Sequence, residues 1–566
     1  MIQELVEFGR KLNEGKSRAL KEELFAIDLV IDEHGRFLKF IPGERKSILA
    51  ENITAKKGKA RLILDKCEEV LGVGEKADKK HQLFMEKLEQ YRKVHSLQPV
   101  FSFYEDKNGE GLTKARDSFS NLDKKTATEN ITFMVGTTRL LDMEDVKAAI
   151  IEHFEAREKD LSDGKRCSVC GRTAYPVVDE PHGMVRMPKG QTAGSALVSY
   201  NEAAFESYGL KGNLNSSICR SCARNYIAAL DFMLSDGHEV KEEKSGKTFY
   251  RYSHRYNISD STVALFWTRQ AIEDIDPFSM FDAPDASEVR NLYSAIWSGN
   301  SQLTQVIDTN MFYSCTLSSA AARIAVRDWT AISLDAYKRN IAEWFKDIEI
   351  VGADGEIVYS SLRAMIRATQ KDKRSGDKKQ SDAASKTRIG TALWNSAIKG
   401  RSFKLPLEMM QYVLARICKG DFFSPERAAI IKLILTRNTD KEMKTKLDND
   451  NNSMAYLCGR LFAIVESMQW KAVGNVNSGL KERYFAAAAA QPATILSNLL
   501  VKNVPIYQHK IKGYLAKELN EIAGRISMQG KFPPRFTTVE QGEFALGYYF
   551  QKMNKPDVEN KDENKQ

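Results

Sequence analysis

The sequence predicts an α+β protein, in which an N-terminal mixed α/β domain carries a four-cysteine insertion and precedes a C-terminal all-helical bundle. Three observations predict this class. Apolar and polar residues alternate in 25–41, as in two neighbouring strands. From about Asp335 onward the apolar residues recur at the 3.6-residue spacing of helices. Between these regions, Cys167-x-x-Cys170 and Cys219-x-x-Cys222 contain four of the eight cysteines.

The expected organisation follows the changes in pattern. Residues 1–162 and 226–335 are predicted to form the two pieces of the α/β domain, with the cysteine-containing insertion at 163–225. The bundle is expected at 336–553, and 554–566 is a polar, charge-mixed stretch typical of a disordered tail. A chain of 566 residues is long enough for several domains, each with a core of its own.

The N-terminal half alternates between helical and extended patterns. After an amphipathic helix at the start, strands are expected at 25–32 and 36–41 around a turn at Asp32–Gly35. Further along we expect a helix at 80–95, a buried strand at 130–136, a helix at 143–155, a helix at 224–234, a charged hairpin at 239–256, and strands at 261–267 and 306–319.

The C-terminal half is predicted to be helical throughout. In 454–468, for example, the apolar residues Leu457, Leu461 and Val465 lie on one stripe. The expected helices are 336–350, 360–370, 389–398, 406–419, 424–436, 454–468, 479–490, 492–500, 507–528 and 540–552. Antiparallel helices of this length, joined by short loops, are typical of a bundle.

The two Cys-x-x-Cys pairs predict a structural zinc site. Two thiolates spaced in this way hold one soft cation from a tight turn, and two such pairs complete a tetrahedron. Four protein ligands leave no open position for a reacting water. The span between the pairs, 171–218, is longer than the usual spacing in a zinc ribbon. We therefore expect a zinc-ribbon-like subdomain with additional residues inserted between the two cysteine pairs. The alternatives are two unrelated pairs of reduced cysteines or a redox pair, although the βαβ pattern of a thioredoxin-type redox motif is missing.

Composition and charge limit the class of protein. No apolar run approaches the roughly 20 residues that a membrane-spanning helix needs. The N-terminal segment Met1–Arg10 contains acidic residues and does not match a signal peptide. We therefore expect a cytoplasmic protein, in which cysteines stay reduced and favour metal binding. The net charge of +9 is a mild basic excess and by itself weakly indicates nucleic-acid binding.

Catalytic motifs are missing from the sequence. It contains no Walker loop, HExxH, GxSxG or kinase motif, and its eight histidines are scattered. The acidic cluster Glu273-Asp-Ile-Asp276 could hold Mg²⁺, but such clusters more often cap helices or face water. The sequence therefore predicts a binding protein rather than an enzyme.

Several long stretches of the sequence carry a family resemblance. They are Thr192–Gly209 followed by Asn213, Ala322–Trp329, Ala455–Glu466 and Glu540–Gln551, with weaker matches at 64–72 and 131–136. The sequence resembles the large subunit of the type I-C CRISPR interference complex (the Csd-type Cascade protein), and the likeness extends over essentially the whole chain. The sequence departs from the family pattern at Asn213–Cys219 and in its four cysteines, which indicates a zinc-stabilised variant and weakens any direct transfer of roles to Asn213 and Asn215.

The resemblance implies a non-catalytic subunit of an RNA-guided complex that surveys DNA. In such complexes base pairing with the guide reads the target, while protein reads a short flanking motif (the PAM). The large subunit would read that motif, help to open the duplex, hold the displaced strand and dock a helicase-nuclease. Its implied partners are the CRISPR RNA, double-stranded target DNA and its displaced single strand, the backbone and handle-binding Cascade subunits, a small helical subunit and the helicase-nuclease.

The candidate residues for reading the flanking motif lie in or beside the cysteine-framed loop. Amide and lysine side chains can hydrogen-bond to base edges, and loops position such groups well only when they are anchored. The candidates are Lys189, Gln191, Ser195, Asn201, Asn213 and Asn215. The alternative is that residues such as Asn201 and Ser207 satisfy backbone groups in local turns.

Two basic segments are candidates for contact with the nucleic-acid backbone, because lysine and arginine clamp phosphates without reading sequence. The first consists of Arg45, Lys46, Lys56, Lys57, Lys59 and Arg61, and the second, a loop that could guide the displaced strand, of Lys371, Lys373, Arg374, Lys378 and Lys379. A solvated surface and a solvated linker are the respective alternatives.

Other family-motif residues allow simpler interpretations. Arg323, Arg327 and Trp329 fit a packed strand, and Arg460 either pairs with a neighbouring helix or contacts DNA. The family implies that a small subunit can arise from an internal translation start. Met443 is the first candidate start and Met454 the rival, so that 443–566 would form a separate helical piece.

Three functions from different classes remain open. The first is the DNA-recognition subunit implied by the resemblance. The second is a zinc-ribbon scaffold that assembles other proteins and does not read DNA. The third is a metal-dependent nuclease, which would need clustered His, Asp and Glu ligands that the sequence does not display. Salt-dependent binding that also depends on the flanking motif would separate the first from the second.

Overall fold

The computed structural model describes residues 1–53, 59–74, 77–120, 128–160, 164–173, 177, 182–241, 246, 248–270, 281, 310–371, 383–439, 441–474, 478–509 and 513–554. The chain divides into two compact units. The N-terminal unit consists of Ile2–Gly183 and Val198–Leu230, and the C-terminal unit of Met1, Met184–Leu197 and Asp231–Gln566. The domain boundaries expected from the sequence at 162, 225 and 335 stay predictions.

The N-terminal unit is built on a curved mixed sheet with the strand order β2-β1-β4-β3, to which β5 adds by pairing with β4. The strands are β1 (Leu20–Ile31), β2 (Phe37–Glu51), β3 (Leu64–Lys66), β4 (Asn130–Val135) and β5 (Thr138–Arg139). β1 pairs antiparallel with β2 and parallel with β4. The predicted turn between β1 and β2 is confirmed, since Asp32 Oδ1 accepts hydrogen bonds from the amides of His34 (2.9 Å) and Arg36 (2.8 Å).

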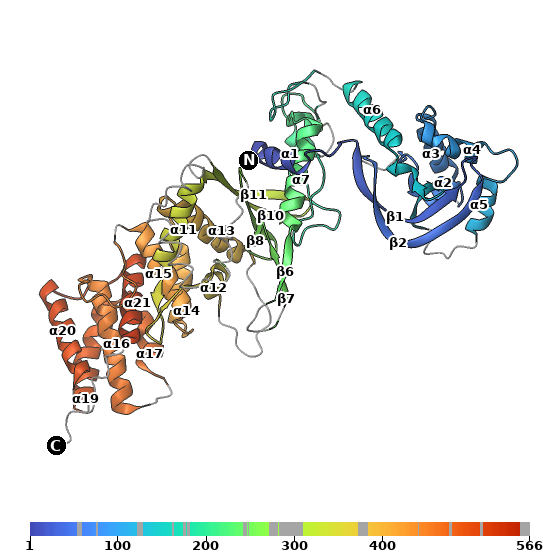
Figure 1. Ribbon diagram of the computed structural model, residues 1–566. Coiled ribbons are helices and arrows are strands. Elements are labelled where there is room, and N and C mark those ends of the chain that lie inside the picture. The colour runs from blue at the N-terminus through green and yellow to red at the C-terminus, as the bar shows by residue number, and fades with distance from the viewer. Residues whose placement is uncertain are drawn as a thin grey trace, which may run out of the picture. The chain divides into compact units, whose positions relative to one another are not determined.

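Several helices pack beside this sheet. Figure 1 draws β1 and β2 as long curved ribbons with α2 to α5 beside them. The helices of this part are α1 (Ile2–Leu12), α2 (Cys67–Leu71), α3 (Ala77–Glu89), α4 (Gln98–Glu105), α5 (Leu112–Phe119), α6 (Glu144–Asp160) and α7 (Arg220–Ser235). The core includes Phe25, Ile27, Phe103 and Phe133, which are almost fully buried. The helix predicted over 80–95 ends earlier, at Glu89, and a short turn follows at His95–Leu97.

α1 packs closely against α7 inside the N-terminal unit. A Cβ added at Gly9 would collide with the backbone carbonyl of Asn225, so this crossing requires glycine. Nearby, the Asn13 side chain donates a hydrogen bond to Asn225 Oδ1 (2.9 Å), and Arg224 donates to the carbonyl of Ser17 (3.1 Å). The first residues of the chain therefore hold the first half of α7, the helix that begins at the second cysteine pair.

The C-terminal unit combines a four-stranded antiparallel sheet, in the order β11-β10-β9-β8, with helices. Its strands are β6 (Gly237–Lys241), β7 (Thr248–Tyr252), β8 (Arg255–Asn257), β9 (Thr262–Thr268), β10 (Met311–Ala320) and β11 (Arg323–Ser333). β6 and β7 form the expected hairpin as a separate two-stranded sheet. Arg323, Arg327 and Trp329 lie on β11, where Arg323 and Trp329 are half-buried and Arg327 is exposed.

The helical region follows β11 directly. Its helices are α11 (Leu334–Ile348), α12 (Leu362–Ala368), α13 (Ala383–Lys399), α14 (Leu407–Cys418), α15 (Pro425–Asn438), α16 (Met454–Val473), α17 (Leu480–Ala490), α18 (Pro492–Asn498), α19 (Val504–Gln508), α20 (Tyr514–Gln529) and α21 (Thr538–Met553). The Ser333 side chain caps α11 by accepting a hydrogen bond from the Ala336 amide. Most of the described elements from Leu334 onward are helices, as the sequence predicts.

Two local predictions in this region were wrong. Between α11 and α12 the chain forms a small hairpin, β12 (Ile350–Val351) with β13 (Ile357–Val358), where only helices were expected. Two-residue strands are too short to show an alternating pattern. The single helix expected at 507–528 is instead α19 and α20. Gly513 stands before α20 with φ +100°, a conformation that no helix contains.

α16 and α21 cross at close range in the C-terminal core. A Cβ at Gly459 would meet the carbonyl of Phe544, and one at Gly547 would meet the carbonyl of Tyr456. Arg460 is buried in this region and donates a hydrogen bond from Nε to Gln551 Oε1 (2.8 Å). Pairing with a neighbouring helix is therefore its structural role.

No helix among the described residues is long and apolar enough to span a membrane.

Candidate metal centre and nucleic-acid interface

The four cysteines come together in the N-terminal unit. Cys167 and Cys170 lie in a tight turn that closes with a hydrogen bond from the Gly171 amide to the Cys167 carbonyl (2.9 Å). Cys219 and Cys222 lie at the start of α7. The four Sγ atoms all lie within 4.8 Å of one another. The sequence prediction that the two pairs form one cluster is confirmed.

The geometry of this cluster fits a tetrahedral zinc ion. Zn–S bonds of about 2.3 Å place the sulfurs of a tetrahedral site about 3.8 Å apart. The Sγ atoms of Cys170 and Cys219 are 3.9 Å apart. The amides of Val169 (3.4 Å) and Cys219 (3.3 Å) donate hydrogen bonds to Cys167 Sγ, as expected around a bound thiolate. The four cysteines could hold the ion between them, and a metal bound there would cross-link the turn to α7.

The electrostatics of the cluster favour loss of a proton at one thiol. A hydrogen bond from the Cys222 thiol lowers the pKa of Cys219 to about 5. Burial raises the pKa of Cys170. Thiols bind a metal as thiolates, so a divalent cation would displace the remaining protons. With all four positions taken by sulfur, the ion would stabilise structure and would not activate water.

Hydrogen bonds tie the first cysteine turn to the chain before α7. Ser168 Oγ donates to the carbonyls of Ser216 (3.3 Å) and Ser217 (3.2 Å), and Ser217 Oγ donates to the Arg166 carbonyl (2.8 Å). Beside them, His182 Nδ1 lies 2.9 Å from the hydroxyl of Tyr226. Burial lowers the pKa of His182 to about 4, so the imidazole is neutral at pH 7. The cysteine turn and the end of the inserted loop form one bonded assembly.

Two of the predicted DNA-reading residues, Asn213 and Asn215, use their side chains inside the protein. Asn213 is buried, and its Oδ1 accepts a hydrogen bond from the Tyr200 amide (2.8 Å). Asn215 Oδ1 accepts from the Ser207 amide (3.0 Å) and hydroxyl (3.1 Å), and its Nδ2 donates to the carbonyls of Leu210 (2.9 Å) and Gly212 (2.8 Å). Both asparagines therefore shape the loop between residues 200 and 212. Asn201 lies on this loop and is exposed.

The other three predicted DNA-reading residues belong to the C-terminal unit. Lys189 and Gln191 are exposed on a turn, with Lys189 at φ +55°. Ser195 is buried and its Oγ donates a hydrogen bond to the Ala321 carbonyl (3.1 Å). Ser195, Asn213 and Asn215 thus bond within the protein in this structure. Lys189, Gln191 and Asn201 are exposed.

In the first predicted phosphate-binding segment, the two arginines are paired with carboxylates and two of the lysines are exposed. Arg45 on β2 makes a two-pronged contact with Glu129 (3.0 and 2.7 Å), and Arg61 pairs with Glu23 (2.8 Å). Lys46 and Lys59 are exposed. Lys56 and Lys57 lie outside the described residues. The exposed lysines remain the better candidates for phosphate, because a paired arginine would have to release its carboxylate first.

Of the second basic segment only Lys371, which is exposed, is described. Lys373, Arg374, Lys378 and Lys379 lie outside the described residues, as does the acidic cluster at 273–276. The predicted disordered tail, 554–566, also falls outside them except for Asn554. Within the described part of the chain, the four cysteines are the only group of three or more His, Cys, Asp and Glu side chains placed to share a metal ion.

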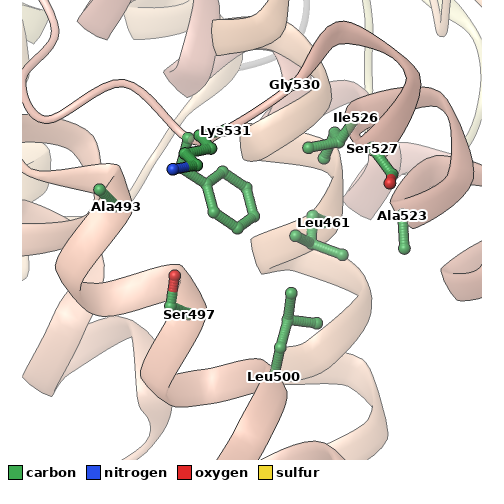
Figure 2. A pocket seen from close by; sticks show the side chains of 10 residues that line it. Leu461, Ala493, Ser497, Leu500, Ala523, Ile526, Ser527, Gly530 and Lys531 are labelled. Carbon is green, nitrogen blue, oxygen red and sulfur yellow. The ribbon is translucent and has the colours of Figure 1, made fainter.

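A cavity of about 420 Å³ opens among α16, α18 and α20 in the C-terminal unit. Figure 2 shows the side chains of Leu461, Leu500, Ser497 and Lys531 around this hollow. Lys531 is the single titratable side chain of its lining, so the cavity lacks the acid–base pair that catalysis would use. Its lining of small and apolar side chains fits packing or binding of an apolar group.

Tyr208, on the loop between the two cysteine pairs, is not among the site residues predicted from the sequence. Tyr208 is fully exposed and has φ +52°. Its motif, Ser207-Tyr-Gly209, contributed to the family resemblance, but neither exposure nor backbone conformation can be deduced from three letters. A tyrosine directly before a glycine in a polar loop was the available signal.

Comparison with known families matches residues 10–555 to a family model described as CRISPR-associated protein (Cas_Csd1). A search of the curated proteins found no match. The family match spans both compact units and includes the cysteine cluster.

Proposed function

The chain belongs to the Csd1 family of CRISPR-associated proteins, the large subunits of type I-C Cascade, and on that premise we propose that it reads the flanking motif of target DNA without catalysing a reaction. The observation that carries the proposal is the match over 10–555. We further propose that it helps to open the duplex, holds the displaced strand and docks the helicase-nuclease. The family implies guide RNA and other Cascade subunits as partners, and the cytoplasm remains the expected location.

The residues proposed to read the motif are the exposed ones, Lys189, Gln191 and Asn201. Asn213 and Asn215 would act indirectly, because they hold the loop that carries Asn201. Lys46 and Lys59, together with Lys56 and Lys57, are proposed to contact phosphate. A structural zinc at Cys167, Cys170, Cys219 and Cys222 would keep the loop in a single conformation.

A small subunit translated from Met443 also remains part of the proposal. Such a piece would contain α16 to α21. In the full chain α21 packs against α14 and α15 as well as α16. A separate 443–566 piece would therefore expose one face of α21, and it would need another surface to cover that face.

A scaffold that does not read DNA is the second candidate. It is favoured by the internal bonding of Ser195, Asn213 and Asn215, three of the six residues predicted to read bases. The nuclease alternative gains no support from the described residues, where no cluster of catalytic carboxylates and histidines occurs.

DNA binding by the assembled guide-RNA complex tests the proposal. Wild type, Asn201→Ala and the double variant Lys46→Ala/Lys59→Ala are compared on targets that differ only in the flanking motif, at several salt concentrations. We expect Asn201→Ala to reduce the preference between motifs by roughly 5- to 100-fold, the range for one good base contact. We expect the lysine variant to weaken all targets alike and to make the slope of log affinity against log salt shallower, by about one for each phosphate that its lysines neutralise.

The matched control is Lys114→Ala, which removes an exposed lysine of the same unit that pairs with Glu110 (3.2 Å). It should leave both preference and affinity unchanged. If Lys189→Ala, Gln191→Ala and Asn201→Ala all keep the wild-type preference while the complex still binds its target, motif reading lies elsewhere and the scaffold function is the better description.

A further inference from the structure

The loop Asn201–Lys211 presents apolar side chains to solvent. Tyr208 is 100% exposed, Leu210 41% and Phe205 39%. Exposed apolar residues are common singly, but three within six residues form a local patch. This patch belongs to the N-terminal unit and lies on the chain between the two cysteine pairs.

The loop that carries the patch is held in place on both sides of Tyr208. Asn215 accepts hydrogen bonds from the amide and hydroxyl of Ser207 and donates to the carbonyl of Leu210 (2.9 Å). Glu206 accepts a hydrogen bond from the Gly212 amide (2.8 Å). Tyr208 is therefore displayed on an anchored loop, and little conformational entropy would be lost on binding.

The backbone of Tyr208 is strained. Its φ of +52° belongs to the left-handed region, which glycine adopts readily and aromatic residues rarely adopt. Tyr208 and Gly209 (φ +71°) are the central residues of a tight turn that the Leu210 amide closes by donating to the Ser207 carbonyl (2.9 Å). The Tyr208 side chain itself is fully exposed. Residues held in such conformations concentrate at binding and catalytic sites. Glycine would fit this turn position with less strain, so the choice of an exposed tyrosine favours a binding role.

The charges beside the patch indicate the kind of partner. Glu202 and Glu206 are exposed on the same loop, and Lys211 is its one basic residue. The loop thus carries two carboxylates against one lysine, which favours a basic surface on the partner. Tyrosine is among the residues most enriched at the energetic centre of protein interfaces, where it fills an apolar pocket.

We propose that Tyr208, with Leu210, inserts into an apolar pocket bordered by lysine or arginine on another protein subunit of the CRISPR complex. Asn215 is a positioning residue that holds the Tyr208 loop in its binding conformation. The proposal goes beyond motif reading and does not depend on it, because the contact forms before target DNA is bound.

The test measures association of the full chain with a complex that holds its guide RNA and all other subunits, in the absence of target DNA. We expect Tyr208→Ala and Tyr208→Gly each to weaken association by at least about 10-fold, the effect of losing an interface anchor. Tyr208→Phe, which keeps the ring, should stay within a few-fold of wild type. Glu202→Lys should slow association, because it reverses the charge beside the pocket.

Thermal unfolding separates binding from stability. Tyr208→Gly relieves the backbone strain, so its Tm should be unchanged or raised by about 1–3 °C while its association is weakened. Trp470→Ala is the control for loss of an exposed aromatic ring, since Trp470 is 68% exposed in the C-terminal unit. It should associate as wild type does.

Two outcomes overturn the proposal. If Tyr208→Gly associates normally but the saturated complex loses affinity for target DNA, the ring contacts nucleic acid and not protein. If neither association nor DNA affinity changes, Tyr208 has no binding role. Failure of the proposed motif reading would instead appear in the Asn201 and lysine variants, with the association of Tyr208→Gly still weakened.

Discussion

The cysteine-framed segment of the N-terminal unit and the helical core of the C-terminal unit are stabilised in different ways. In 164–173 and 198–219 the buried apolar residues are Cys167, Ile218 and Cys219, and hydrogen bonds hold most of the chain. α16, by contrast, is buried along most of its length among aliphatic and aromatic side chains. A segment that buries so little apolar surface needs another source of stability, and a metal held by the four clustered thiols could supply it.

Charge is also used differently in the two regions. In the C-terminal core Asp347 accepts hydrogen bonds from the buried Arg437 (2.8 Å) and from Arg401 (2.8 Å). Lys432 is buried beside them and donates to the carbonyls of Lys346 (3.0 Å) and Asp347 (3.1 Å) at the end of α11. Asp347, Arg437 and Lys432 are buried, so each depends on its partners, whereas the loop near the cysteines exposes its charges to water.

If the four cysteines hold the proposed zinc ion, its removal should produce the largest difference between the regions. Structural zinc sites of this kind contribute on the order of 10 kcal/mol. We expect Cys222→Ser, or treatment with a chelator, to release zinc and to increase protease cleavage and amide exchange in 164–219. The helices α14 to α16 should keep their protection. Elemental analysis and hydrogen exchange measure both effects, and equal protection of 164–219 with and without zinc would contradict the prediction.

Loss of the buried carboxylate should destabilise the C-terminal core. Asp347→Ala leaves Arg437 without its carboxylate partner in the interior, and we expect the free energy of unfolding to fall by about 3–5 kcal/mol. Asp335→Ala, which removes an exposed ion pair with Arg339 from the same helix, is the matched control and should change it by less than about 1 kcal/mol. Thermal unfolding compares the two, and equal effects would show that burial is irrelevant here.

The pH dependence of stability should identify the buried lysine. Burial lowers the pKa of Lys432 from 10.5 to about 8. Between these values the unfolded chain binds more protons than the folded one, so the free energy of unfolding should rise as pH increases from 8 to 10.5. The rise has an upper limit of about 3 kcal/mol. Lys432→Met should lack this contribution, and parallel pH profiles for the two proteins would show that Lys432 titrates normally.

The smallest effect is expected from a substitution in the exposed loop near the cysteines. Asn215→Ala removes the side-chain hydrogen bonds that hold the exposed loop, at a cost of about 1–3 kcal/mol in local stability. Amide exchange should become faster in 200–212 and stay unchanged in α16. Gln191→Ala, at an exposed position, is the control. Unchanged exchange in the loop would mean that Asn215 does not anchor it.

The sequence predicted many elements of both units and missed several, among them α4, α5 and the β12–β13 hairpin. The β1–β2 turn at Asp32–Gly35 and the stripe of α16 were predicted because their signals are local and repeated. The β12–β13 hairpin and the break at Gly513 depend on two to four residues, which is too few for a period to be recognised. The clustering of the cysteines followed from their spacing, since each pair can occupy two corners of one tetrahedron.

By itself the sequence determined the helical character of most of the C-terminal half, the pairing of Cys167–Cys170 with Cys219–Cys222 in one site, and the family. These depend on periodicity, spacing and extended motifs, which are properties of the chain. Only the tertiary structure decided that Asn213 and Asn215 turn inward while Tyr208 stands exposed on the loop they hold. The reason is physical: a polar side chain bonds to whichever groups the folded chain brings beside it, and composition does not identify those neighbours.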